Sequence, residues 1–197
     1  MTGLIILAAG ASSRLGRPKQ NLIYNEKTLL QHSIDVALAS KSSIVVLVLG
    51  SNMTTINPEV SHKKLHITIN DNWLEGMSSS IKCGLEKLLK LDSEISEVLL
   101  MLCDQPFVDA HLINKLIDER QKSGKRIAAC SYAKTLGTPA IFYSSLFPEL
   151  LSLNGSQGAK NLIKKYLEEV VSVPFPLGEI DIDTMDDFDN LLGLNNL

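Results

Sequence analysis

The sequence predicts an α/β protein in which helices cover both faces of a mainly parallel β-sheet, giving three layers. Short apolar runs alternate along the chain with longer segments of helical period, as such folds require. The runs are continuously apolar rather than alternating with polar residues, which indicates strands buried on both faces. No stretch reads as a linker, a low-complexity tract or a repeat of fixed period, so we expect residues 1–197 to form a single domain.

Six short runs, rich in β-branched residues or leucine, are the expected strands. They are Gly3–Ala8, Ile44–Leu49, Leu65–Ile69, Val98–Leu102, Ile127–Cys130 and Ala140–Tyr143. Three apolar faces with helical spacing lie between them. These faces consist of Leu30, Ile34 and Leu38, then of Ile81, Leu85, Leu88 and Leu89, and then of Leu112, Ile113, Leu116 and Ile117. Since ligands bind beyond the carboxyl ends of parallel strands, the residues that follow each strand are the first candidates for a site.

Composition excludes several classes of function. The formal net charge of −3 provides no basic field for nucleic acid, so we expect no nucleic-acid partner. No apolar run approaches the roughly 20 residues that cross a bilayer, and no signal peptide is evident, which predicts a cytoplasmic protein without membrane contact. The three cysteines lack zinc-ligand spacing, and we expect them to be buried thiols.

The loop after the first strand carries the chemistry of a phosphate site. Small residues from Ala8 to Ser13 let the backbone approach a ligand, and their N–H groups can form an anion-binding nest. Arg14 and Lys19 add positive charge where triphosphate oxygens would lie. The loop is neither a Walker A motif, which needs Gly-Lys followed by Ser or Thr, nor a dinucleotide fingerprint with its three glycines.

This loop resembles the signature of the nucleotidyltransferases that complete the molybdenum cofactor, in particular their cytidylyltransferase branch. The matching segments are Leu7-Ala8-Ala9-Gly10, Ser12-Ser13-Arg14-Leu15-Gly16 and Pro18-Lys19-Gln20. The resemblance implies a Rossmann-like fold of the glycosyltransferase-A type. It also implies nucleotide binding by Leu7, Ala8, Ala9 and Gly10, with Arg14 and Lys19 as nucleotide-binding and catalytic residues.

A second loop, Asn70–Ser80, precedes the helix that carries Ile81. Serines at a helix start can cap free N–H groups and leave the positive end of the helix dipole facing an anion. Capping alone would need only one serine. The segment resembles the same family's second motif, which implies that Gly76 and Ser79 bind nucleotide. Trp73 is equally well explained as a core anchor.

Two acidic positions are candidate metal ligands. Asp104 directly follows the buried strand Val98–Leu102, where a charge without a partner is costly, and Mg²⁺ shared with phosphate oxygens would compensate it. Pro106 stiffens the turn before Asp109, a candidate N-cap. The Cys-Asp-Gln-Pro run resembles the family's metal motif, which implies that Asp104 is catalytic and binds both metal and nucleotide.

Near the C-terminus, Glu179–Thr184 alternates acidic and apolar residues as a strand would, with Asp181 and Asp183 on one face. The run resembles the family's Asp-Ile-Asp-Thr motif, so the second metal carboxylate is assigned to Asp183, with Asp181 as the alternate. The following acids, Asp186 and Asp187, suit the first turn of a helix.

Two further segments bear on the acceptor. Gly137-Thr138-Pro139-Ala140 resembles a family element in which a turn enters a strand near the acceptor site. The family usually reads Gly-Asp, one residue, then Gly-Ala-Arg, whereas this chain has Ser156 in place of the aspartate and Lys160 in place of the arginine. Lysine cannot hold a phosphate bidentately as arginine does, which leaves the identity of the acceptor open.

The resemblance implies transfer of CMP from CTP to the phosphate of molybdenum-bound molybdopterin, with release of pyrophosphate and with Mg²⁺ as cofactor. Cytidylyl members read Leu-Ala-Ala-Gly, whereas guanylyl members tend to carry an extra glycine where Ala9 sits, and a β-carbon there narrows the room for a purine. A recipient molybdoenzyme is a possible partner for the product.

Several alternatives remain. The same chemistry can use GTP, or another acceptor such as a sugar or alditol phosphate. The departures at Ser156 and Lys160 would also suit a non-catalytic nucleotide-binding paralogue. The glycine loop after a strand would suit an NAD(P)-dependent oxidoreductase, although the dinucleotide fingerprint is missing.

Overall fold

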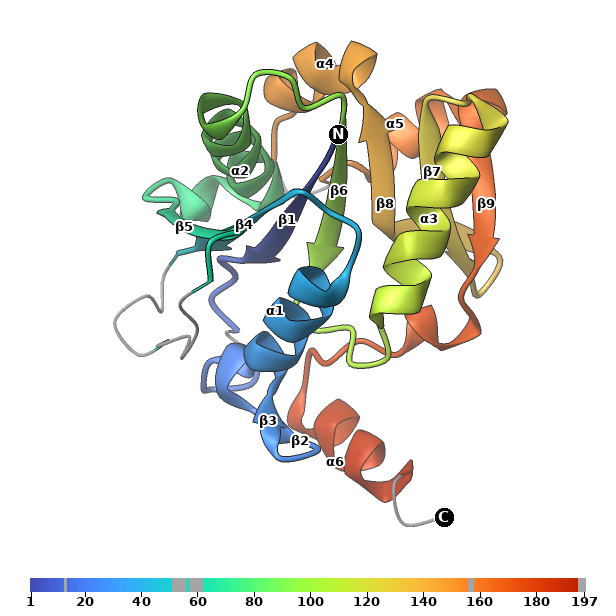
Figure 1. The fold of residues 1–197 in the computed structure, drawn as a ribbon. Coiled ribbons are helices and arrows are strands. Elements are labelled where there is room, and N and C mark those ends of the chain that lie inside the picture. Colours follow the sequence, from blue (N-terminus) through green and yellow to red (C-terminus); the bar gives the residue numbers. More distant parts are fainter. Residues whose placement is uncertain (13, 51–55, 57–61, 156–157, 195–197) are drawn as a thin grey trace.

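A seven-stranded sheet forms the centre of the computed structural model, which describes residues 1–12, 14–50, 56, 62–155 and 158–194 (Figure 1). Its strands, in spatial order, are β5 (Leu65–Ile69), β4 (Ile44–Leu49), β1 (Thr2–Ala8), β6 (Glu97–Leu102), β8 (Thr135–Tyr143), β7 (Ile127–Tyr132) and β9 (Val170–Pro174). All neighbouring pairs are parallel except those that β8 makes with β6 and with β7. The predicted class, a mainly parallel sheet, is confirmed.

Helices cover both faces of this sheet. They are α1 (Leu29–Ala39), α2 (Met77–Leu91), α3 (Ala110–Ser123), α4 (Phe147–Ser152), α5 (Lys160–Lys165) and α6 (Met185–Leu194). The apolar faces of α1 and α3 pack in one core, and those of α2, α4 and α5 pack in the other. Successive side chains of β1 supply the two cores in turn, so Leu4 and Ile6 face α1 and α3 while Ile5 and Leu7 face α2. The three predicted layers are therefore present.

Within the described residues, no helix is both long and apolar enough to span a membrane. Of the three cysteines, Cys103 and Cys130 are buried as expected. Cys83, on α2, is only partly buried, and its thiol donates to the carbonyl oxygen of Ile69 at 3.5 Å.

Three features differ from the sequence-based expectations. Strand β9 was missed, because it lies at an edge of the sheet where only Val170 and Val173 are buried. Gly137–Ala140 is not a turn that enters a strand; it lies within β8, opposite a register shift between Ala129 and Cys130 that accommodates the extra residues. Residues 180–183 form no strand, because they join a 3₁₀ helix to α6.

A third apolar cluster ties the C-terminal segment to the N-terminal loop. It contains Leu15, Leu22, Tyr24, Leu29, Ile182, Phe188 and Leu191. In Figure 1, α6 lies beside the short hairpin of β2 (Ile23–Tyr24) and β3 (Lys27–Thr28). The backbone N–H of Ile182 also donates to the carbonyl oxygen of Asp104 at 3.0 Å. This cluster carries the segment before α6 to the carboxyl ends of β1 and β6.

We expect Gly84→Ala on α2 to lower the free energy of unfolding. A β-carbon at Gly84 would lie 2.7 Å from Ile5 and 2.9 Å from Val48, two buried side chains of the sheet. Overpacking of this kind costs about 1–3 kcal/mol, more than the gain of up to about 1 kcal/mol in helix propensity. Urea denaturation measures the difference.

Gly193→Ala on α6 is the matched control, because a β-carbon there meets nothing within 4 Å. This substitution should raise the free energy of unfolding by up to about 1 kcal/mol. If both substitutions changed stability in the same direction, the proposed close packing of α2 on the sheet would be wrong.

Candidate active site

A cavity of about 370 Å³ opens at the carboxyl ends of β1 and β6. This cavity lies at the sheet edge where a site was predicted. Of the residues predicted to bind nucleotide, seven line this cavity: Leu7, Ala8, Ala9, Gly10, Lys19, Gly76 and Asp104. Two predicted residues, Arg14 and Ser79, lie beside the cavity lining rather than within it.

A buried amide side chain holds the loop that follows β1. The Gln20 side chain is 1% exposed, and its Nε2 donates to the carbonyl oxygens of Ala8 at 2.7 Å and Gly10 at 3.3 Å. The backbone N–H of Lys19 donates to Ser12 Oγ at 3.0 Å. These bonds fix the curvature of the loop over the cavity. No role was assigned to Gln20 from the sequence, because nothing in its spacing shows that the chain folds back to β1.

Two cations and two carboxylates form one cluster at the edge of the cavity. Lys19 Nζ lies 2.5 Å from Asp104 Oδ2 and 3.0 Å from Asp183 Oδ1. Arg14 Nη2 lies 2.7 Å from Asp183 Oδ2. The side chains of Lys19 and Asp104 are 14% and 11% exposed, whereas that of Arg14 is 68% exposed. The inner pair is thus largely shielded from water, whereas Arg14, although paired with Asp183, is exposed to a ligand that approaches from outside.

Burial and charge act in opposite directions on Lys19. Burial by itself lowers the pKa of its ammonium group, but the charge and hydrogen bond of Asp104, with help from Asp183, outweigh burial and raise the pKa above its ordinary value. Burial by itself raises the pKa of the Asp183 carboxyl group, but Lys19 and Arg14 lower it by more. The net shift of this pKa is therefore downward. Lys19 therefore stays cationic, and Asp183 stays anionic, throughout the neutral range.

Asp181 lies close enough to this cluster for the charges of the cluster to shift its pKa. Burial raises the pKa of its carboxyl group, and the negative charges of Asp104 and Asp183 raise it further. The strand expected here is absent, because Asp187 caps α6 and accepts hydrogen bonds from the backbone N–H groups of Asp183 at 3.2 Å and Thr184 at 2.7 Å. Asp183 is thus positioned by a helix cap rather than by the face of a strand.

The carboxylates fit a divalent cation that is shared with phosphate oxygens. Asp104 Oδ1 is buried and has no hydrogen-bond partner in the described structure, so this acceptor is available to a cation. Asp104 and Asp183 already converge on one positive charge, that of Lys19. Among the residues that the structure describes, no three His, Cys, Asp or Glu side chains form a complete metal site. Mg²⁺ is commonly held by one or two carboxylates plus substrate phosphates, which agrees with this incomplete set.

The second loop is organised differently from the prediction. Gly76, not a serine, occupies the N-cap position of α2, with φ 98°. Ser79 Oγ accepts from Asn70 Nδ2 at 2.8 Å and donates to the carbonyl oxygens of Asn72 and Gly76, at 2.9 and 2.8 Å. The prediction that serines cap this helix is wrong, because Ser79 instead ties the loop to the end of β5. These hydrogen bonds position the loop, and nucleotide binding by Ser79 stays a prediction.

Gly50 lets three segments converge on the cavity. A β-carbon at Gly50 would lie 2.6 Å from the carbonyl oxygen of Ala9 and 3.0 Å from the β-carbon of Trp73. Trp73 packs on the apolar core beneath α2, as the core interpretation predicts, and it also lines the cavity. Gly50 was missed in the sequence, where it simply follows a strand.

The residues expected near the acceptor line a neighbouring cavity of about 160 Å³. Thr138 and Lys160 line it, and it shares Leu7, Met77 and Leu102 with the active-site cavity. Lys160 is the first residue of α5 and is exposed. Ser156, the other departure from the family pattern, lies outside the described residues. The elements that resemble the acceptor site thus adjoin the nucleotide cavity.

We expect Lys19→Met to lower the free energy of unfolding by about 3 kcal/mol at pH 7, because it leaves buried Asp104 without its cation. The pKa of Asp183 is depressed in the folded state, so its contribution is present above its ordinary pKa of about 3.9 and is lost as the pH falls through the folded value. The difference between wild type and variant should therefore shrink below about pH 4.

Denaturant unfolding between pH 3 and pH 7 measures this difference. Lys41→Met is the matched control, because Lys41 pairs with Asp118 on the surface, with both side chains more than half exposed. It should cost less than about 1 kcal/mol. A Lys19→Met effect that is equal at pH 3 and pH 7 would contradict the electrostatic account.

Known proteins share this architecture. The chain is 27% identical over 202 residues to "Nicotine blue oxidoreductase" of Paenarthrobacter nicotinovorans, covering 95% of each chain. A crystal structure of the Rv0371c homologue from Mycobacterium sp. strain JC1 is 31% identical, with a TM-score of 0.83, covering 98% of this chain and 96% of that one. Rv0371c of Mycobacterium tuberculosis, solved as a complex with manganese, is 26% identical, with a TM-score of 0.77 and 98% coverage of both chains.

A family model also matches most of the sequence. The model of the MobA-like NTP transferase domain matches residues 4–170, a range that contains the glycine loop, Lys19 and Asp104. Asp183 and α6 lie beyond the matched range. Because the match spans far more than half of the chain and the glycine loop borders the site, this protein belongs to the MobA-like NTP transferase family.

Proposed function

We propose that this nucleotidyltransferase transfers CMP from CTP to the phosphate of molybdenum-bound molybdopterin and releases pyrophosphate. One observation carries the proposal: Lys19, Asp104 and Asp183 meet at the edge of a cavity bordered by the glycine loop. Membership of the MobA-like family supports the transfer of a nucleotide. The choice of CTP and of a pterin acceptor rests on the sequence motifs, which resemble those of molybdenum cofactor cytidylyltransferases.

The cavity wall at Ala9 supports a pyrimidine nucleotide. Ala9 lines the cavity, and its carbonyl oxygen already lies so close to Gly50 that no side chain fits between them. Trp73 borders the same space. The backbone of Ala9 therefore cannot move away from the cavity. Its β-carbon limits the space for a purine base.

The reaction consists of in-line attack by an acceptor phosphate oxygen on the α-phosphorus of CTP. A new P–O bond forms, the bond between the α-phosphorus and the oxygen that leads to the β-phosphate breaks, and the electron pair leaves with pyrophosphate. Both reactants are anionic, so catalysis comes mainly from positioning and from neutralisation of charge. Lys19, which is permanently charged, and the exposed Arg14 stabilise the negative charge on the α- and leaving phosphates.

Asp104 and Asp183 are the residues that would hold Mg²⁺, our proposed cofactor. When bound, the ion supplies neutralising charge and orients the phosphate oxygens. Lys19 Nζ lies between the two carboxylates. The manganese complex of the 26%-identical Rv0371c supports a divalent cation in this family, and Mg²⁺ itself is proposed from the oxygen ligands.

We also propose the domain organisation of the protein, its cellular compartment and the destination of its product. Residues 1–197 act as a single nucleotidyltransferase domain, because the proposed site residues gather at one edge of one sheet. The site is cytoplasmic, where nucleoside triphosphates are available. The product passes to a recipient molybdoenzyme, as the resemblance to the cofactor-completing enzymes suggests.

A nicotinamide-dependent reduction is the second candidate. It is favoured by the 27% identity to a protein named an oxidoreductase, and opposed by the lack of the three-glycine fingerprint after β1. Titration with NADH and NADPH, followed by their fluorescence, separates the two candidates. Absence of binding removes the oxidoreductase, and pyrophosphate release removes a purely nucleotide-binding paralogue.

We expect Asp104→Ala to abolish pyrophosphate release from CTP, and Lys19→Met to slow it by at least about 10²-fold, since each removes a preorganised charge from the phosphates. The protein is incubated with Mg²⁺, each of the four NTPs and candidate acceptors, including sugar and alditol phosphates, and pyrophosphate is measured. Asp118→Asn, at an exposed surface carboxylate, is the control and should keep full activity. Full activity of Asp104→Ala would refute the proposed site.

We expect Ala9→Gly to shift the preference from CTP towards GTP. Loss of one methyl group at a cavity wall changes discrimination by roughly 10-fold or more. The ratio of kcat/KM for CTP to that for GTP, measured in both proteins, tests this. Equal kcat/KM for CTP and GTP in the wild type would refute the assignment of the base.

A further inference from the structure

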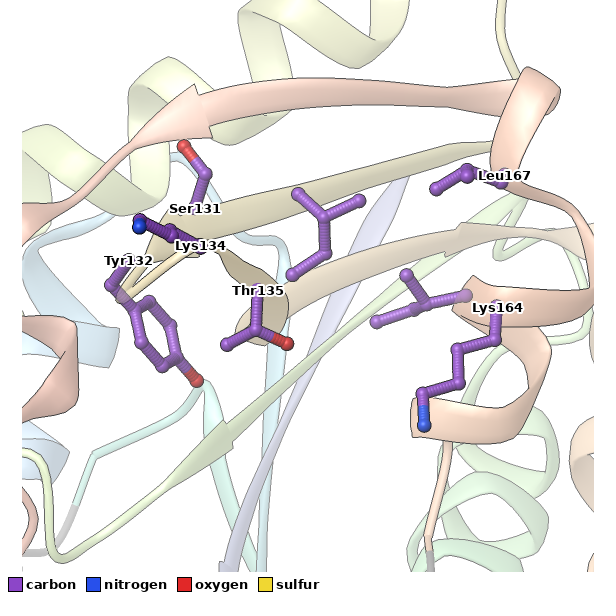
Figure 2. A pocket seen from close by; sticks show the side chains of 8 residues that line it. Ser131, Tyr132, Lys134, Thr135, Lys164 and Leu167 are labelled. Carbon is purple, nitrogen blue, oxygen red and sulfur yellow. The ribbon is translucent and has the colours of Figure 1, made fainter.

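A third cavity extends the active site across the sheet. It has a volume of about 590 Å³ and lies between the turn that joins β7 to β8 and the helix α5. We call it the hairpin cavity; Tyr132, Lys134, Thr135, Ile163, Lys164 and Leu167 are among its lining residues (Figure 2). It shares Tyr132 and Ile163 with the cavity that adjoins the nucleotide site. The three cavities therefore form one series that begins at Asp104.

The two cavities beyond the active-site cavity are lined by positively charged side chains. Lys160 lines the middle cavity, and Lys134 and Lys164 line the hairpin cavity. No aspartate or glutamate is among the residues that line either cavity. Over residues 1–12, 14–50, 56, 62–155 and 158–194, none of the three lysines has an ion-pair or hydrogen-bond partner, unlike neighbouring Lys165, which pairs with Glu149 at 2.6 Å. Three ammonium groups are thus available to an anionic ligand.

The walls between these ammonium groups are apolar or carry hydroxyl groups. Figure 2 shows Lys134 and Lys164 on opposite sides of the hairpin cavity, with Thr135 between them. Leu167 lines the cavity and is 57% exposed, so it presents apolar surface to a ligand there. The cavity thus matches a ligand with an apolar or aromatic body and a negatively charged group.

The backbone that presents Lys134 is strained. Ala133 and Lys134 form the two-residue turn between β7 and β8, with φ values of 44° and 60°. Asparagine and glycine are preferred in such turns, because a β-carbon is unfavourable in the left-handed region. Strained residues of this kind persist mainly where a function retains them. This turn places Lys134 at the rim of the hairpin cavity.

We propose that the hairpin cavity binds the far end of the acceptor, an apolar or aromatic body that carries a second anionic group between Lys134 and Lys164. This rests on the proposed function, since it specifies the acceptor class for that site. Three strand spacings of roughly 4.8 Å separate β1 from β7 in the order β1, β6, β8, β7, a span of about 14 Å. The acceptor is therefore an elongated phosphate ester that carries a second negative charge on its body, away from the reacting phosphate.

Direct binding of a small probe tests the proposal without turnover. The probe is 6-carboxypterin, an aromatic ring system with one carboxylate, and its fluorescence reports binding. We expect the wild-type protein to bind it with a Kd on the order of 1 mM or tighter, and the double variant Lys134→Gln with Lys164→Gln to bind about 10-fold more weakly. Raising the salt concentration should weaken binding to the wild type, because both lysines are exposed.

Two further variants distinguish an effect of lysine charge on probe binding from an effect on folding. Lys122→Gln, on α3 and so on the opposite face of the sheet, removes the same charge and should leave probe binding unchanged. Lys134→Gly relieves the left-handed strain, so its unfolding midpoint should equal or exceed that of the wild type while probe binding weakens. Equal affinity of the wild type and the double variant, no binding at all, or displacement of the probe by saturating CTP would overturn the proposal.

Turnover supplies the second measurement. In the double variant the KM for the phosphorylated acceptor should rise about 10-fold, while kcat and the KM for CTP stay unchanged. An unchanged acceptor KM would overturn the inference and leave the proposed function intact. Loss of probe binding in the double variant, together with no pyrophosphate release by the wild type, would support the anionic site and refute the nucleotidyl transfer.

Discussion

One buried ammonium group organises the active site. Lys19 lies between two carboxylates that come from distant parts of the chain, and without it the buried carboxylate of Asp104 would have no cation as a partner. The carboxylates keep Lys19 charged despite its burial, so the protein holds a permanent cation at the place where phosphates are expected. The same arrangement keeps two carboxylates directed at one point, which suits a divalent cation. Structure and chemistry are therefore linked by one set of charges.

Apolar packing determines where these charges meet. The parallel pairing of β1 with β6 brings the glycine loop beside Asp104. A separate apolar cluster docks α6 on the β2–β3 hairpin, and this contact carries Asp183 to the same edge of the sheet. The active site thus depends on an apolar contact that shares no residue with the chemistry. Residues such as Gln20 and Asn70 then hold the two loops at the cavity rim.

The balance of positive and negative charge changes along the sheet. Charges are paired near the nucleotide, where carboxylates and cations alternate, whereas the lysines toward β7 and α5 have no acidic residue among their cavity neighbours. An acceptor that reaches across this surface would meet increasing positive potential with distance from the metal carboxylates. Attraction of this kind orients an anion and raises its local concentration. Both substrates of the proposed reaction would be guided by charge rather than by shape alone.

The sequence by itself determined the layered fold, because buried parallel strands and amphipathic helices leave strong local patterns. It also determined the placement of Asp104 and Lys19 at one edge, since parallel strands end together. It did not predict β9, the capped loop that holds Asp183, or the roles of Gln20 and Gly50. Those features depend on contacts between segments far apart in the chain, which no local periodicity encodes. Only the tertiary structure decided that three lysines with no acidic neighbours in their cavities line one path from the active site.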